Sequence, residues 1–127
     1  MLDEVPAIIC VENLSDGAVL GRLRDGRTRT VVVAAANGDR SSAREPLWQA
    51  PLAVVPPGET GCVEGLASIL VRPALNLWTT RPAHVLLNGR EDFTDCRLPR
   101  PLDAGVRLTF TYRSGALGGT CRAKDIR

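Results

Sequence analysis

The sequence predicts an all-β fold: a single-domain antiparallel β-sandwich or jelly roll of about eight short strands, with little helix. Two observations predict it. Short apolar runs recur at intervals of roughly ten residues, and turn-forming residues such as Asp25-Gly26, Asn37-Gly38 and Pro56-Pro57-Gly58 separate them. No segment carries the long apolar stripe at the helical period that an amphipathic helix requires.

Length and composition are typical of one globular domain, which we expect to span residues 1–127. The net charge is only +2, so a polybasic protein that coats nucleic acid indiscriminately is not expected. No apolar run approaches the roughly 18 residues of a membrane span. The N-terminal MLDEVPAIIC is acidic with a short apolar run, so we expect no signal peptide and a location in the cytoplasm or within an assembled particle.

Three strands are predicted in the first third of the chain, over residues 6–12, 18–24 and 28–35. The first is a nearly continuous apolar run, as in a strand with both faces covered. Asp25-Gly26 and Asn37-Gly38 follow the second and third strands, and both dipeptides favour the type I′ turn of a β-hairpin. This segment therefore predicts an antiparallel meander in which each strand pairs with the next.

A polar loop is predicted at about 37–50, and the strand pattern resumes after it. Further strands are expected over residues 51–55, 67–72, 75–80, 83–87 and 105–113. The last is the clearest, because Val106, Leu108, Phe110 and Tyr112 alternate with polar residues, as in a half-buried strand. The glycine-rich segment that follows it is expected to form a turn or a β-bulge.

Four arginines surround Asp25-Gly26 within eight positions. If this dipeptide is a two-residue turn, Arg24 lies opposite Arg27 and Arg22 lies opposite Arg29, and all four side chains share one face. Like charges placed directly opposite each other destabilise a sheet by up to about 1 kcal/mol. A compensating interaction is therefore expected.

Three interactions could offset this repulsion, and the sequence leaves all three open. The patch could bind an anionic ligand, such as the phosphates of a nucleic acid, a lipid headgroup or a sulfated sugar. It could meet carboxylates of a neighbouring subunit. It could also be a solvated edge hairpin whose charges prevent aggregation. The candidate anion-binding residues are Arg22, Arg24, Arg27 and Arg29.

The four cysteines, Cys10, Cys62, Cys96 and Cys121, are far apart and form no Cys-x-x-Cys pair. The chain also has a single histidine, so no metal site is predicted. Without a secretory signal, reduced and mostly buried thiols are the expected state. In an oxidising compartment four cysteines allow three pairings, and the sequence does not choose among them.

The sequence contains no recognisable catalytic motif, and we expect a protein that is not an enzyme and needs no cofactor. His84 lies in an apolar run and is expected in the core or at its rim. Glu91, Asp92 and Asp95 belong to a predicted polar turn. Asn13-Leu14-Ser15 matches a glycosylation sequon.

Two tryptophans are the candidate interface residues. Trp48 lies in the predicted polar loop, either as an interface anchor or as a side chain that folds back to cover one end of the sandwich. Trp78 alternates with Leu75 and Leu77, and so faces away from them, in a second packing layer or at a subunit contact.

Three segments together resemble the aegerolysins, which are small β-sandwich proteins that recognise lipids. They are I-x-x-x-x-N-x-S near the N-terminus, LWQAPLAVVPPGETG and LTFTYRSGALGG. A second set, AVVPPGETGCVEG, HVLLNGREDF and AGVRL, is similar in order to strands of the dUTPase-like fold. Both resemblances imply an all-β fold, and the first implies recognition of an acidic lipid.

The features together predict a non-enzymatic binding or structural β-sandwich. We expect it to self-associate or to dock on a larger assembly, for example as a structural or decoration subunit of a virus or phage. The alternative is a module that recognises an anionic ligand (a nucleic acid, an acidic lipid or a glycan) through the arginine-rich hairpin. The expected partners are other copies of the chain or a larger protein assembly, then a polyanion, and least of all a membrane surface.

Overall fold

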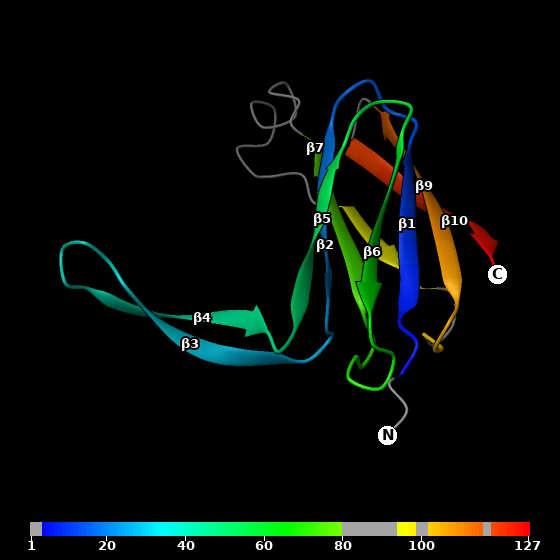
Figure 1. The fold of residues 1–127 in the computed structure, drawn as a ribbon. Coiled ribbons are helices and arrows are strands. Elements are labelled where there is room, and N and C mark those ends of the chain that lie inside the picture. The colour runs from blue at the N-terminus through cyan, green and yellow to red at the C-terminus, as the bar shows by residue number, and fades with distance from the viewer. Residues whose placement is uncertain (1–3, 80–93, 99–101, 116–117) are drawn as a thin grey trace.

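The computed structural model describes residues 4–79, 94–98, 102–115 and 118–127. This part of the chain forms ten strands and no helix (Figure 1). The strands are β1 Ala7–Asn13, β2 Val19–Arg24, β3 Thr28–Ala34, β4 Arg40–Pro46, β5 Gln49–Val55, β6 Thr60–Gly65, β7 Ala74–Thr79, β8 Thr94–Arg97, β9 Arg107–Gly115 and β10 Gly118–Ile126. The predicted all-β fold is confirmed, and no helix of the described residues is long and apolar enough to cross a membrane.

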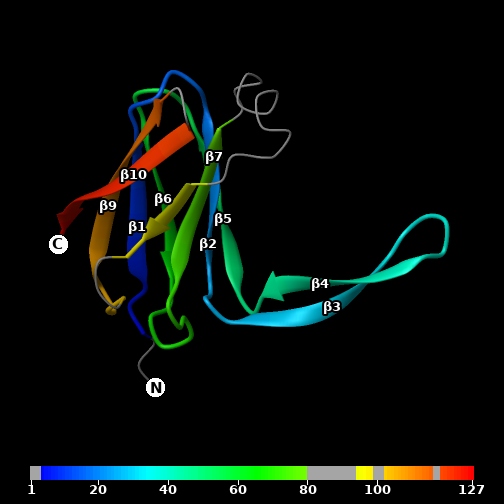
Figure 2. The same cartoon turned by 180° about the vertical axis from the view of Figure 1, so that it is seen from behind.

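Two four-stranded sheets pack face to face, as Figure 2 shows from the back of the molecule. The first sheet has the strand order β10-β9-β1-β6, and the second has the order β5-β2-β7-β8. All described pairings are antiparallel except that of β1 with β9, which is parallel and aligns Ile9 with Leu108 and Val11 with Phe110. The first sheet is therefore mixed, because it contains one parallel pair of strands.

The core lies between the two sheets. Leu108, Phe110 and Tyr112 of β9 are all buried, as their alternation in the sequence predicts, and they pack with Ile9 and Val11 of β1. The second sheet contributes Val19, Leu23, Leu52, Leu75 and Leu77. Each large apolar side chain that is fully buried stabilises the fold by about 1.5–3 kcal/mol.

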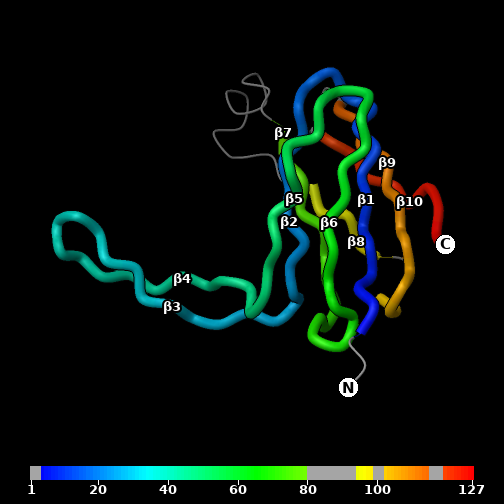
Figure 3. The backbone as a smooth tube through the Cα atoms, in the orientation of Figure 1, coloured from blue at the N-terminus to red at the C-terminus, as the bar shows by residue number. Residues whose placement is uncertain are grey.

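The hairpin β3–β4, which we call the arm (residues 28–46), projects away from the sandwich (Figures 1 and 3). Its side chains are exposed along nearly its whole length, with Val32 at 70% and Val33 at 46% exposure. The tip turns at the predicted Asn37-Gly38, where Gly38 has a φ of 89°. The arm thus contributes no side chain to the buried core.

The polar loop predicted over 37–50 is wrong, because residues 40–46 form β4 and β5 begins at residue 49. The polar composition of β4 predicted a loop because a strand was expected to carry apolar residues on one buried face, and β4 has no buried face. The strand predicted over 67–72 is also wrong. There the backbone of Val71 bonds to Asp25 and Gly26 and not to a neighbouring strand. The strand predicted over 83–87 lies outside the described residues.

Besides β4, three further strands were not predicted, and each of them lacks an apolar run. β6 (TGCVEG) is short and contains two glycines, and β8 (TDCR) is short and largely polar. β10 begins with two glycines and carries mostly polar side chains. β10 pairs with β9 as a hairpin, with a bulge between Ala123 and Asp125. Sheet partners, and not composition, keep these segments extended.

All four cysteines are in disulfides, so the expectation of reduced thiols is wrong. Cys10 and Cys62 are directly paired on β1 and β6, with their Cα atoms 4.0 Å apart. Cys96 of β8 and Cys121 of β10 join edge strands of opposite sheets, with a Cα–Cα distance of 5.4 Å. The sequence conceals these pairs because strand order brings distant cysteines together.

The Cys96–Cys121 disulfide closes a sequence separation of 25 residues. Since such a crosslink restricts the unfolded chain, we predict that Cys96→Ala/Cys121→Ala lowers the free energy of unfolding by about 3 kcal/mol. Urea unfolding of the variant and the unmodified protein measures the difference. An equal free energy of unfolding, or wild-type protein that reacts with a thiol reagent when denatured without reductant, would contradict this pairing.

Candidate functional site

The arginine hairpin predicted at Asp25-Gly26 does not form. β2 pairs with β5 and β7, so that Arg24 lies opposite Gln49 on one side and Ala74 on the other. β3 pairs with β4, which places Arg29 opposite Glu45. The four arginines therefore do not make one patch, because Asp25-Gly26 is a bend between two sheets and not a turn between two paired strands.

Asp25 produces this bend through its buried carboxylate. The side chain is 1% exposed and accepts hydrogen bonds at Oδ1 from the backbone amides of Arg27 (2.9 Å) and Val71 (3.3 Å). Arg27 Nη2 lies 2.6 Å from Oδ2, and the Gly26 amide donates to the Val71 carbonyl at 2.9 Å. We call this set of contacts, made by Asp25, Gly26, Arg27 and Val71, the Asp25 clamp.

The clamp favours the ionised form of Asp25. The hydrogen bond from the Arg27 side chain is the largest cause, and it lowers the pKa of Asp25 from 3.8 to about 2, although burial opposes the shift. The amides of Arg27 and Val71 lower this pKa further. Arg27 Nη2 also donates to the Ile69 carbonyl at 2.6 Å. Arg27 is thus a structural residue that ties the arm to the connection between β6 and β7.

Gly26 is required at the bend by close packing. A Cβ atom at this position would lie 2.6 Å from the Arg72 carbonyl oxygen and 2.7 Å from that of Val71. Both distances are shorter than van der Waals contact, and both atoms are backbone. Only glycine lets the two chain segments approach this closely.

Arg22 and Arg24 remain together on the outer face of the second sheet. The Nε atoms of Arg24 and Arg22 lie 2.6 Å and 3.4 Å from Asn76 Oδ1, and Arg22 Nη1 donates to Gln49 at 2.9 Å. Asn76 in turn donates to Asp95 of β8. A buried amide thus holds two arginine side chains side by side.

Arg44 of the arm joins these two arginines, and we call Arg22, Arg24 and Arg44 the elbow cluster. The three line a pocket of about 400 Å³ together with Thr28, Pro46, Asn76 and Asp95. Sequence reasoning missed Arg44, because only the pairing of β3 with β4 brings it next to Thr28, to which it donates at 3.2 Å. Arg29 is absent from the cluster, since its Nε lies 2.7 Å from Glu45 Oε1. Anion binding by Arg22, Arg24, Arg27 and Arg29 stays a prediction.

The two tryptophans lie in different places. Trp48 is half-buried and packs against the core, close to Gly65, and its carbonyl accepts the Asp25 amide at 2.9 Å. This position matches the alternative in which Trp48 folds back over one end of the sandwich. Trp78 is half-buried on β7 opposite Leu20. An interface role for either one stays a prediction.

The remaining sequence candidates divide between described and undescribed residues. His84, Glu91 and Asp92 lie outside the described residues, and Asp95 lies on β8. Asn13 of the sequon is fully buried, and its Nδ2 donates to the carbonyls of Gly17 (2.8 Å) and Val55 (2.9 Å), so its amide is occupied in the folded chain. In the part of the chain that the structure describes, no three His, Cys, Asp or Glu side chains are placed to hold a metal ion.

We predict that Asp25→Asn lowers the free energy of unfolding by about 2 kcal/mol at pH 7, because it removes the charged partner of Arg27. The folded-state pKa of Asp25, about 2, lies below its ordinary 3.8. Its contribution is therefore present above about pH 4 and is lost as the pH falls toward 2. Urea unfolding at several pH values should show the gap between wild type and variant closing over this window.

The exposed carboxylate of Asp103 provides a control, and Asp103→Asn should change little at any pH. If the difference in the free energy of unfolding between wild type and Asp25→Asn stayed the same down to pH 2, ionisation of Asp25 would not stabilise the bend.

The fold is shared with solved structures, two of which are from Bacteroides species. A protein described as a "putative cell adhesion protein" from Bacteroides uniformis aligns with 96% of this chain at 15% identity and a TM-score of 0.57. A second protein with the same description, from Bacteroides ovatus, aligns with 97% of the chain at 9% identity and a TM-score of 0.54. The chain spans about half the length of these proteins, 50% and 45% respectively. No family model and no curated protein matches the sequence, so neither resemblance to the aegerolysins nor that to the dUTPase-like fold gains support.

Proposed function

We propose that this chain is a non-enzymatic binding domain that assembles with further copies of itself through the arm. The observation that carries the proposal is the exposure of the arm, which extends from the sandwich with both faces and both outer edges uncovered by the described residues (Figure 1). A two-stranded hairpin is marginally stable in water by itself. An arm of this kind gains stability when a partner covers it.

The side chains of the arm suit a protein partner. Val31, Val33 and Ala43 share one face, and Val32 lies on the other. Exposed valines on an unpaired strand favour association with another chain. Each strand of the arm has seven residues, so with its turn the arm supplies close to the roughly 20–30 residues found on one side of a standard interface.

A second copy of the chain offers complementary charge. Arg40 of the arm is exposed and makes no ion pair with any described residue. On the sandwich, Glu59 directly precedes β6 and Glu64 lies on β6. Both are exposed, and their side chains make no ion pair within the described ranges. Contact between the arm of one copy and these carboxylates of the next would be heterologous, and such contacts build rings or filaments.

The disulfides and the solved structures support the same role. Disulfides persist in oxidising compartments, so two of them favour an exported protein over the cytoplasmic location that the sequence suggested. The two proteins that share the fold are each described as a "putative cell adhesion protein", and such a role fits a domain that works by binding. These observations support our proposal that the domain works in a surface or extracellular assembly.

We predict that the protein forms oligomers whose mass rises with concentration, and that Val32→Glu/Val33→Glu shifts the assembly midpoint to at least about tenfold higher concentration. Size-exclusion chromatography with light scattering measures both. The control is Val54→Glu, at a position 57% exposed on the sandwich, which should assemble like the wild type. The charge reversal Glu59→Lys/Glu64→Lys should weaken assembly, and Arg40→Glu should restore it.

A wild-type protein that remains a monomer at all concentrations would overturn the proposal. So would equal loss of assembly in the Val54 control. Excess absorbance at 260 nm that disappears in high salt would indicate bound nucleic acid, and would favour the alternative function of polyanion recognition through the elbow cluster.

A further inference from the structure

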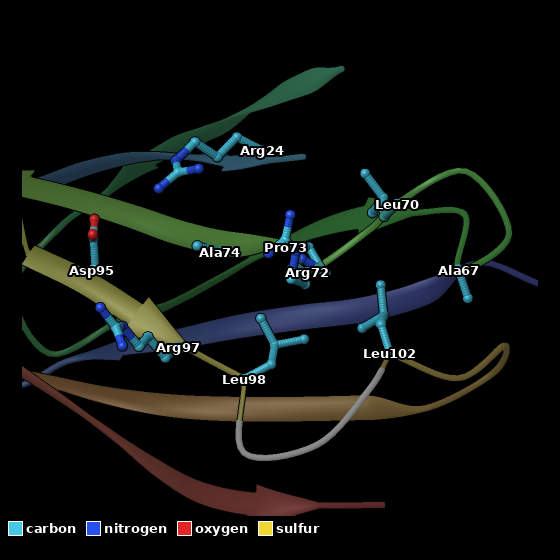
Figure 4. A pocket seen from close by; sticks show the side chains of 10 residues that line it. All are labelled: Arg24, Ala67, Leu70, Arg72, Pro73, Ala74, Asp95, Arg97, Leu98 and Leu102. Carbon is cyan, nitrogen blue, oxygen red and sulfur yellow. The ribbon is translucent and has the colours of Figure 1, made fainter. Parts of the chain in front are cut away.

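We infer that a second site, the pocket at the end of the β2–β7–β8 surface, binds a small amphipathic carboxylate (Figure 4). The pocket has a volume of about 690 Å³ and lies where β7 begins and β8 ends. Ligand sites for small molecules usually measure about 300–1,000 Å³ and combine apolar walls with a few polar groups. Two properties of the lining residues indicate the class of ligand.

The first property is a charged end built by strand register. Arg24 pairs with Ala74, and Ala74 pairs with Arg97, so the two arginines flank an alanine in one row across three strands. Neighbouring strands lie about 4.8 Å apart, which places the Cα atoms of the two arginines about 10 Å apart. The methyl group of Ala74 leaves the space between the guanidinium groups open. This spacing suits one carboxylate held from both sides.

Several donors at this end have no partner among the described residues. Arg24 donates from Nε to Asn76 Oδ1 at 2.6 Å and from Nη1 to the Asp25 carbonyl at 3.3 Å. Its Nη2 makes no hydrogen bond with the described residues. The side chains of Arg72 and Arg97 make no hydrogen bond or ion pair with the described residues. The residues that line the pocket include three arginines but one carboxylate, that of Asp95. The excess positive charge favours an anionic ligand.

The Asp25 clamp positions the third arginine. Arg72 has a φ of 47°, and it is the one non-glycine residue with a positive φ in the described part of the chain. This conformation is strained for a residue with a side chain and persists only where the surroundings impose it. Here the surroundings are the bonds of Val71 to Asp25 and Gly26. The strained backbone thus belongs to Arg72, the residue that the clamp holds at the pocket.

The second property is an apolar end opposite the charges. Leu70 and Leu102 are 7% and 9% exposed, and Leu98 and Ala67 lie beside them. In Figure 4 Leu70, Ala67 and Leu102 lie on one side of the pocket and Arg24, Asp95 and Arg97 on the other, with Leu98 and Arg72 between the two groups. A simple inorganic anion would leave the leucines unused, and a neutral apolar molecule would leave the arginines unpaired. The lining therefore fits a carboxylate that carries an aliphatic body.

The test is calorimetric titration of the full chain with dodecanoate below its micelle concentration. We expect one molecule bound per chain, and Arg72→Gln/Arg97→Gln should weaken binding at least tenfold, because each charge-assisted hydrogen bond contributes that much or more. The matched control is Arg113→Gln/Arg122→Gln, which removes two arginines from a polar pocket on the outer face of the other sheet. This control should bind dodecanoate like the wild type, and thermal melting confirms that both variants fold.

Two further probes test the two ends of the pocket separately. Acetate should bind far more weakly than dodecanoate, and dodecyltrimethylammonium, with the opposite charge, should not compete. The proposal is overturned if dodecanoate does not bind at millimolar concentration or if the Arg72/Arg97 variant binds it unchanged. It is also overturned if acetate or the cationic detergent binds equally well.

Discussion

The buried carboxylate of Asp25 fixes the point at which the chain leaves the sandwich and enters the arm. Two strands bend together there, since the amide of Asp25 bonds to Trp48 and the amide of Leu47 bonds to Arg27. The ladder of β2 and β5 thus continues into the ladder of β3 and β4 across one corner. Arg27 neutralises the carboxylate at 2.6 Å, so the bend carries no buried unpaired charge, which would be costly.

The same carboxylate connects the arm to the end pocket. Its bond to the Val71 amide holds the connection between β6 and β7 against the bend, and Arg72 follows directly. The arm and the pocket therefore share one support, although they present different chemistry. The arm offers valines and strand edges to a protein, and the pocket offers arginines and leucines to a small molecule. A change at Asp25 should affect both, whereas changes at Val32 or Arg97 should each affect one.

The sequence predicted the features that depend on local pattern. The alternation of Leu108, Phe110 and Tyr112 identified β9 and its buried face, and Asn37-Gly38 identified the tip of the arm. Features that depend on long-range pairing were not predictable in this way. Examples are the parallel pairing of β1 with β9 and the disulfide between Cys96 and Cys121.

The arginines show why the candidate site was predicted only in part. Asp25-Gly26 has the composition of a hairpin turn, and local reasoning therefore paired Arg24 with Arg27. The structure uses Asp25 as a buried acceptor and Gly26 as the point of closest approach between two segments, and neither role has a local sequence signal. Arg22 and Arg24 stay together because alternate residues of one strand always share a face. Arg44, Arg72 and Arg97 join them only through tertiary structure.

Hydrogen–deuterium exchange of the arm amides at different protein concentrations tests most directly whether the arm is the contact element. At the lowest concentration the amides of β3 and β4 should exchange much faster than those of β7 and β9, because the arm is covered by no other part of the described chain. At concentrations where oligomers form, the arm amides should become protected while those of the sandwich stay unchanged. Protection that is the same at all concentrations, or oligomers whose arm amides still exchange rapidly, would contradict this account.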